Sequence, residues 1–168
     1  MKIRKAKDSN NISQIVNSVL LDNFSTKENG FLTANLEQQY YADLIAKSDY
    51  CYIAYEEDKA VGFLLAFPSS HLSQDDDIER YFIQKYPGEN FIYIFQIAVM
   101  PEYQKKGVAR ALYQKLFDDT NGIRKMVATS VVPYNSASEK FHLKMEFSKV
   151  GTLTRDDGGS SYIYEFSS

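Results

Sequence analysis

The sequence is poor in the residues that build disulfides and metal centres. It has one cysteine, Cys51, and two histidines, His71 and His142, in 168 residues. A single cysteine forms neither an intramolecular disulfide nor a cysteine metal cluster, and with only two histidines a zinc site is disfavoured, so no metal is expected. Cys51 lies in the apolar segment YCYIAY and is interpreted as a small core residue.

Long apolar runs are also missing. No run reaches the roughly 18 residues of a membrane span. The first residues, MKIRKAKDSNNI, contain no apolar block of signal-peptide length. We therefore expect a cytoplasmic protein without a membrane partner.

The charge balance is mildly acidic, with a formal net charge of −3, and 44% of the residues are hydrophobic. This composition is typical of a soluble globular protein. An acidic balance argues against a general nucleic-acid binder, for which a basic domain is expected. Because there is no repeat, low-complexity tract or interdomain linker, residues 1–168 are expected to form one domain.

Apolar periodicity and turn signals divide the chain into strands and helices. Ser9 or Asn10 can cap a first helix, and Thr33 a second, which has Tyr40 on its apolar side. Later helices are expected at 107–120 and 135–144, and 78–85 could form a short one. Strands are expected at 1–7, 50–56, 60–67, 91–99, 125–132, 147–154 and 161–166. The order β-α-α-β-β-β-α-β-α-β-β predicts an α/β (α+β) protein, a mixed sheet with helices packed on it.

The most distinctive stretch is 91–120, a buried strand followed by a turn and a helix. The turn, QKKGVA, places Lys105, Lys106 and Arg110 at the start of the helix, where the helix dipole disfavours cations. Cations at this position become favourable if the free N–H groups of the first turn bind an anion there. The pattern therefore predicts an anion site at this turn.

Two segments carry a family resemblance. Residues 97–110, IAVMPEYQKKGVAR, and residues 135–147, NSASEKFHLKMEF, resemble the strand–turn–helix and the following helix of the GNAT superfamily of N-acetyltransferases. The resemblance implies a mostly antiparallel sheet whose fourth and fifth strands splay apart. It also implies that acetyl-CoA is the cosubstrate and an amine the acceptor.

The resemblance assigns the cofactor-binding residues. The pantetheine arm would pair with the edge of the fourth strand, and a backbone N–H at Val99 would polarise the thioester carbonyl. The pyrophosphate would lie on the N–H groups of the turn, where Gly107 lets the backbone approach closely. The residues implied are Ile97, Ala98, Val99, Gln104, Lys105, Lys106, Gly107, Val108, Ala109, Arg110 and Asn135.

The catalytic residues are less well determined. The family places a tyrosine acid where this chain has His142, whose imidazole can also donate a proton near neutral pH. Positions where the family carries a carboxylate base hold Gln96 and Ser130. Tyr93, placed on the same strand face as Ile97, is interpreted as core. Glu102 is interpreted as a helix cap, so no base is assigned.

Alternative interpretations stay open. Gln96 supports a non-catalytic acyl-CoA sensor on the same fold. A plain phosphate site is disfavoured because the turn lacks the lysine order of a P-loop. The acceptor site is expected from 22–40, 69–88 and 155–160, whose acidic residues either favour a cationic amine or are ordinary surface charge. Whether the chain forms a homodimer is also left open.

Overall fold

The computed structural model describes residues 1–20, 30–33 and 36–167. The loop expected at 22–30 lies almost wholly outside these ranges. The strands are β1 (Lys2–Lys5), β2 (Tyr50–Glu56), β3 (Lys59–Pro68), β4 (Phe91–Val99), β5 (Arg124–Ser130), β6 (Ser148–Thr154) and β7 (Ser160–Phe166). The α-helices are α1 (Asn10–Val19), α2 (Gln38–Lys47), α3 (Asp77–Lys85), α4 (Val108–Asp119) and α5 (Ser136–Lys144), and short 3-10 turns cover Ser69–His71 and Pro101–Tyr103.

The strands form one sheet in the order β1-β2-β3-β4-β5-β7-β6. Neighbours are antiparallel except β4 and β5, which are parallel. The predicted fold class is therefore confirmed. The observed order adds α3 between β3 and β4, at the segment where a short helix was considered.

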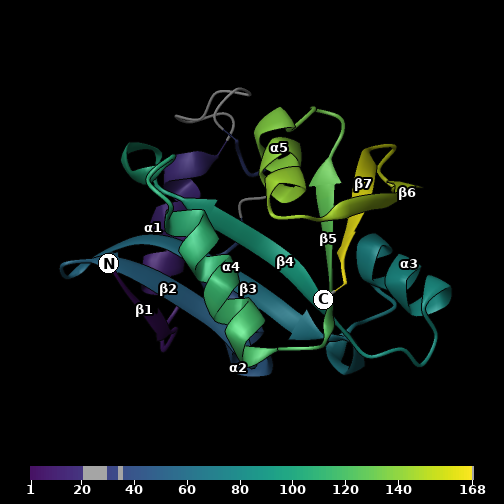
Figure 1. The fold of residues 1–168 in the computed structure, drawn as a ribbon, viewed down its shortest axis with the longest axis horizontal. Coiled ribbons are helices and arrows are strands. Elements are labelled where there is room, and N and C mark those ends of the chain that lie inside the picture. The colour runs from purple at the N-terminus through teal and green to yellow at the C-terminus, as the bar shows by residue number, and fades with distance from the viewer. Residues whose placement is uncertain (21–29, 34–35, 168) are drawn as a thin grey trace.

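Helices cover both faces of this sheet (Figure 1). On one face, α1 and α2 pack on β2 and β3, and Phe82 of α3 packs on Phe91 and Tyr93 of β4. On the other face, Leu112, Tyr113 and other residues of α4 pack on β2 to β4, and α5 lies beside it over β5 and β7. In Figure 1, α4 crosses in front of β3 and β4 while α1 lies behind the sheet.

A β-bulge in β4 changes which residues share a face. Leu65 pairs with Gln96 but Ala66 pairs with Ile94, so Phe95 is an extra residue without a partner on β3. A bulge shifts the alternation of side chains by one position. Tyr93 and Gln96 therefore face the α1–α3 side. Tyr93 is core, as predicted, but its placement with Ile97 was wrong.

Several local predictions were also wrong. The second helix does not begin after Thr33; it begins at Gln38, with Glu37 as its N-cap residue. Tyr40 is 48% exposed, whereas Tyr41 is fully buried, because Tyr41 shares a face with Leu44 and Ile45. The strand expected to reach residue 132 ends at Ser130. Within the described ranges, no helix is long and apolar enough to cross a membrane.

Candidate functional site

The two central strands separate halfway along β4. Its pairing with β5 covers only Phe91 to Ile94, although β5 continues to Ser130, paired with β7. Beyond Ile94, β4 keeps β3 as its partner on one edge, and its other edge has no partner among the described strands. The splayed strand pair is therefore confirmed. We call this opening the fork.

The register shows which backbone groups face the fork. The Met100 N–H donates to the Val61 carbonyl across the β3–β4 ladder at 2.9 Å. In an antiparallel ladder alternate residues bond to the same neighbour, so the N–H groups of Gln96 and Ala98 also point to β3. The N–H groups of Ile97 and Val99 consequently point into the fork.

The basic turn lies directly after this edge. Gly107 has φ +85° and is the N-cap residue of α4, and Lys105 also has positive φ, +61°. Left-handed backbone of this kind turns successive N–H groups towards one side and makes an anion-binding concavity. The Gln104 side chain donates to the Val99 carbonyl at 3.1 Å, which ties the turn to the end of β4.

The cations of the turn are solvent-exposed. Lys105, Lys106 and Arg110 form no ion pair with a carboxylate in the part of the chain that the structure describes. Lys106 lies 5.2 Å from the centre of the Tyr103 ring. Their charges are therefore available to an external anion, while Glu102, the acid of this turn, pairs with Lys59 at 3.0 Å.

Both polar atoms of the Asn135 side chain form hydrogen bonds within the protein. Its Oδ1 accepts from the Ser138 N–H at 3.1 Å and caps α5, as predicted from its residue type. Its Nδ2 donates to the Phe31 carbonyl at 3.0 Å. The amide thus joins the segment after α1 to the start of α5, and its contact with acetyl-CoA stays a prediction.

His142 lies in the core and not on the surface of the fork. It is 1% exposed, and its ring packs among Tyr113, Phe147 and Tyr164. Nδ1 donates to the Ser138 carbonyl at 2.7 Å, so Nε2 accepts from the Tyr113 hydroxyl at 2.6 Å. Burial lowers the pKa of His142 to about 4, although the bond to Ser138 opposes this shift. A neutral ring in this arrangement has no free proton for a leaving group, so the acid role stays a prediction that requires the ring to change partners.

Burial of His142 predicts a specific pH dependence of stability. The unfolded histidine takes up a proton near pH 6.5, whereas the folded one does so only near pH 4. Unfolding therefore becomes easier as the pH falls through this window, by up to about 3 kcal/mol. Urea denaturation at pH 7 and pH 4.5 should show this loss in the wild type and a smaller one in His142→Phe.

The matched control for this experiment is the exposed histidine, His71, whose replacement by Phe should retain the full pH dependence. Equal pH dependence in His142→Phe and the wild type would contradict the burial of a neutral ring. The same His142→Phe protein tests the acid role, because a catalytic ring requires kcat to fall more than acetyl-CoA affinity, and unchanged turnover removes His142 from the mechanism.

Gln96 occupies the position where a base was sought, just beyond the last residue pair of β4 and β5. It is 9% exposed, and its Oε1 accepts from the Tyr41 hydroxyl at 2.9 Å. Burial raises the pKa of Tyr41 to about 12, so this phenol stays protonated and donates. With its oxygen held by Tyr41, Gln96 has only its NH₂ group to offer to the site, which is a donor and not a base.

The other candidates for a base are also unsuited to the task. The Ser130 hydroxyl donates to the Pro133 carbonyl at 2.9 Å. Burial raises the pKa of Tyr93 well above its usual value, so its phenol stays neutral. Glu102 is exposed and held by Lys59, and hydrogen bonding to backbone lowers its pKa. None of these three side chains is therefore placed to take a proton from an amine.

The two described loops expected at the acceptor site meet. Arg80 of α3 bonds to Asp156 of the β6–β7 turn at 2.9 Å, and the Asp156 N–H donates to Asp77 at 2.7 Å. Asp77 also pairs with Arg80. Two of the acidic residues expected around the acceptor site, Asp77 and Asp156, are therefore neutralised by Arg80. Asp76 caps α3 through the N–H groups of Ile78 and Glu79.

Tyr41, Tyr113 and Phe31 were missed as partners of site residues. Spacing with Leu44 and Ile45 could have placed Tyr41 on the buried face of α2. Tyr113 follows Leu112 in an apolar helix, and nothing in the sequence marks it as the partner of His142. The Phe31 contact with Asn135 joins residues 104 positions apart, which no local pattern reports. Among the described residues, no cluster of three or more His, Cys, Asp or Glu could hold a metal ion.

Comparison with known proteins identifies the fold and the family. Residues 16–147 match the family described as the acetyltransferase (GNAT) family. No curated protein sequence matches the chain significantly. Three similar solved structures are Arabidopsis thaliana Naa50 in complex with a bisubstrate CoA analogue, the Escherichia coli ribosomal-protein-S18-alanine N-acetyltransferase, and smu.2055 from Streptococcus mutans.

These likenesses extend over nearly whole chains at low sequence identity. The first has 18% identity and TM-score 0.67 and covers 99% of this chain and 98% of that one. The second has 14% identity and a TM-score of 0.63, and covers 99% of this chain and 92% of that one. The third has 18% identity and a TM-score of 0.71, and covers 99% of each chain. At such identities, the solved structures show a common fold.

Proposed function

The chain belongs to the acetyltransferase (GNAT) family, and from that premise we propose that it is an N-acetyltransferase that moves an acetyl group from acetyl-CoA to a primary amine. The amine is a small molecule or a peptide. We further propose that residues 1–168 act as one such domain. The observation that carries the proposal is the unpaired edge of β4, with two N–H groups facing the fork, immediately followed by the basic turn.

The two parts of the proposed site suit the two ends of acetyl-CoA. The N–H groups and exposed cations of the turn from Gln104 to Arg110 match the charge of a pyrophosphate. The edge groups of Ile97 and Val99 match an extended amide chain, which pairs with a strand edge as another strand does. The solved Naa50 structure, of the same fold, contains a bisubstrate CoA analogue, which supports this placement.

The chemistry follows from these positions. The amine nitrogen attacks the thioester carbonyl carbon, the C–S bond breaks, and the thiolate of CoA takes up a proton. Negative charge that develops on the carbonyl oxygen is stabilised by the Val99 N–H. Because Gln96 accepts no proton, the proposal has the attacking amine lose its proton to water or arrive uncharged.

A carboxylate at position 96 should accelerate this reaction. In Gln96→Glu, the carboxylate would lie within hydrogen-bonding distance of the Tyr41 hydroxyl and beside the fork. General bases contribute about 10²–10⁴-fold, so we expect kcat/KM at pH 7 to rise roughly tenfold, a small part of that range. The acidic limb of the pH–rate profile should move to lower pH. Gln96→Leu, which removes the donor without adding a base, is the control, and identical profiles for both variants would place proton removal elsewhere.

The competing proposal is a non-catalytic acyl-CoA sensor, and the amide at Gln96 is the observation that favours it. The two proposals differ in one measurable outcome. An enzyme releases free thiol from acetyl-CoA faster when an amine is present, whereas a sensor binds acetyl-CoA and releases none. An amine panel that includes a polyamine, an amino sugar and a peptide N-terminus covers cationic acceptors, which acidic residues around the acceptor site would favour.

A further inference from the structure

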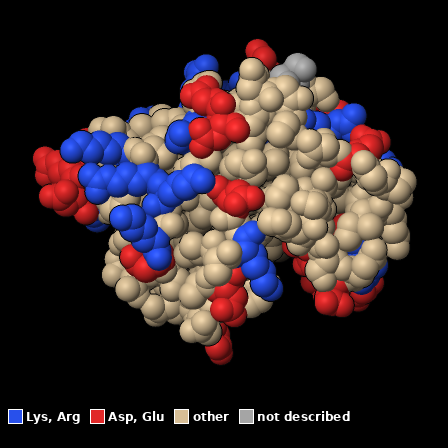
Figure 2. Space-filling model, turned by 90° about the horizontal axis from the view of Figure 1, so that it is seen from below, with Lys and Arg blue, Asp and Glu red and all other residues tan. Residues whose placement is uncertain are grey.

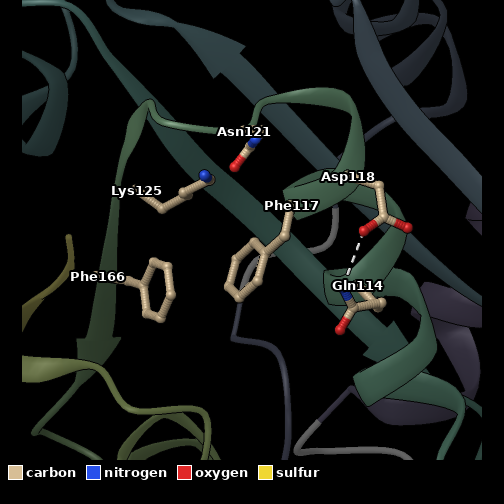
Figure 3. Close-up of a pocket in the computed structure, with 6 residues that line it drawn as sticks. All are labelled: Gln114, Phe117, Asp118, Asn121, Lys125 and Phe166. Atoms are coloured by element: carbon tan, nitrogen blue, oxygen red, sulfur yellow. Dashed lines mark hydrogen bonds between the residues drawn. The ribbon is translucent and has the colours of Figure 1, made fainter. Parts of the chain in front are cut away.

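A second pocket lies at the opposite end of α4 from the basic turn. It has a volume of about 460 Å³, and Figure 3 shows the side chains that line it. These are Gln114, Phe117, Asp118, Asn121, Lys125 and Phe166. The lining begins at Gln114, six residues or about 9 Å along the helix axis from Val108, where the proposed pyrophosphate site lies.

The unusual residue of this pocket is Lys125 on β5. It is 1% exposed, and its Nζ donates to the Thr120 carbonyl at 2.9 Å. That carbonyl already accepts from the Ile123 N–H at 3.0 Å, so the end of α4 does not need the lysine for a hydrogen bond. An ammonium group carries three donors, and the bond to Thr120 uses one of them.

The charge of Lys125 has no acidic partner in the described part of the chain, where none of the ion pairs includes it. Asp118, the acid in the pocket lining, accepts instead from Gln114 at 2.9 Å, the dashed line in Figure 3. Burial lowers the pKa of Lys125. A buried cation without a counter-charge is unfavourable, and an external anion would relieve that cost.

The walls beside the lysine are aromatic. The rings of Phe117 and Phe166 are stacked with their centres 4.6 Å apart and an angle of 18° between their planes. The Lys125 ammonium lies 5.1 Å from the centre of the first ring and 5.8 Å from that of the second. In Figure 3, the Asn121 carboxamide and the Lys125 ammonium both belong to the lining of the pocket.

The lining does not favour a highly charged ligand, because Lys125 is its one basic residue and Asp118 its one acidic residue. Figure 2, which views the molecule from below, shows basic and acidic side chains next to one another towards the left of that face. The pocket therefore combines one buried positive charge with apolar walls and lacks a cluster of cations. This combination matches a ligand with a single negative charge and an apolar body.

We propose that this pocket binds a small aromatic carboxylate, whose carboxylate pairs with Lys125 and whose ring packs against Phe117 and Phe166. The binding is separate from acetyl transfer, because none of the lining residues belongs to the fork or to the basic turn. The carboxylate supplies the missing counter-charge and fills the donors of Lys125 that Thr120 leaves free.

The test compares benzoate with benzamide, its neutral analogue, by NMR titration of the full chain without acetyl-CoA. Benzoate should shift the signals of Phe117, Lys125 and Phe166, and benzamide should bind roughly tenfold more weakly or worse, because it lacks the charge-assisted bond. In Lys125→Met, this preference should disappear. Equal binding of the two probes to the wild type, or no shift with about 10 mM benzoate, would overturn the proposal.

A stability measurement separates the ligand role from a structural one. Methionine has nearly the length of the lysine stem without its charge, so Lys125→Met should melt at the same temperature as the wild type or higher. A clear fall in Tm would mark Lys125 as a cap of α4 and would count against the proposal. The probe comparison in the wild type stands even if the variant fails to fold.

Discussion

Replacing Val99 by proline is expected to lower kcat by about 10²–10³-fold in a protein that still folds. The Val99 N–H points into the fork and takes no part in the β3–β4 ladder, so its loss breaks no strand pairing. Removing one preformed donor to a developing oxyanion costs about this factor in other acyl-transfer enzymes. Steady-state kinetics with saturating acetyl-CoA and amine measures the effect.

Two variants show whether the effect belongs to this one N–H group. Val99→Ala shortens the side chain and keeps the N–H, so its kcat should stay within a few-fold of the wild type. Ala98→Pro removes an N–H that faces β3, and should destabilise the sheet instead. If Val99→Pro retains wild-type kcat, the backbone donor has no role in the reaction.

Replacing Gly107 by valine is expected to weaken acetyl-CoA binding by a hundredfold or more. Gly107 has φ +85°, and a β-branched residue is strained in that conformation. To relax, the turn must rotate its N–H groups away from their common direction. Hydrogen bonds to a charged ligand are worth about 1.5–3 kcal/mol each, and losing two of them gives the predicted factor. Isothermal calorimetry with acetyl-CoA measures it.

Gly122 provides a matched control at the other end of α4. It has φ +73°, and a Cβ added at either glycine meets nothing within 4 Å, so both substitutions strain the backbone without a clash. Gly122→Val should lose a similar amount of stability, about 1–2 kcal/mol, and bind acetyl-CoA normally. Equal affinities of the two variants for acetyl-CoA would show that the turn does not hold the cofactor.

The sequence predicted the parts of the site that depend on local patterns. Residues 91–99 form β4, and the helix predicted to follow Gly107 begins at Val108. These features depend on apolar runs, on proline and on glycine, which tolerates positive φ, and a single sequence shows all three. The order of strands and helices along the chain came from the same patterns and was confirmed, with α3 as an addition. The splayed fourth and fifth strands came from the family resemblance and were also confirmed.

The parts that were missed depend on contacts between distant segments. The bulge at Phe95 moves Tyr93 to the other face from Ile97, and no residue type in FIYIFQIAV marks it. The acid role of His142 was predicted from the pKa of a histidine in water. In the fold, Tyr113 and Tyr164 lie against the ring, and its burial favours the neutral form. The bond from the Asn135 amide to the Phe31 carbonyl was not foreseen, while the contact of Asn135 with acetyl-CoA stays a prediction. Each result is set by tertiary packing, which a single sequence does not report.

The central claim is that the fork and the basic turn serve amine acetylation. Its most direct test is the release of free thiol from acetyl-CoA by the purified chain, measured with and without each amine of the panel and alongside calorimetric binding of acetyl-CoA. The account predicts saturable binding and thiol release that rises with at least one amine and falls in Val99→Pro. Binding of acetyl-CoA without amine-dependent thiol release would identify a sensor. No binding of acetyl-CoA up to sub-millimolar concentrations would contradict the central claim.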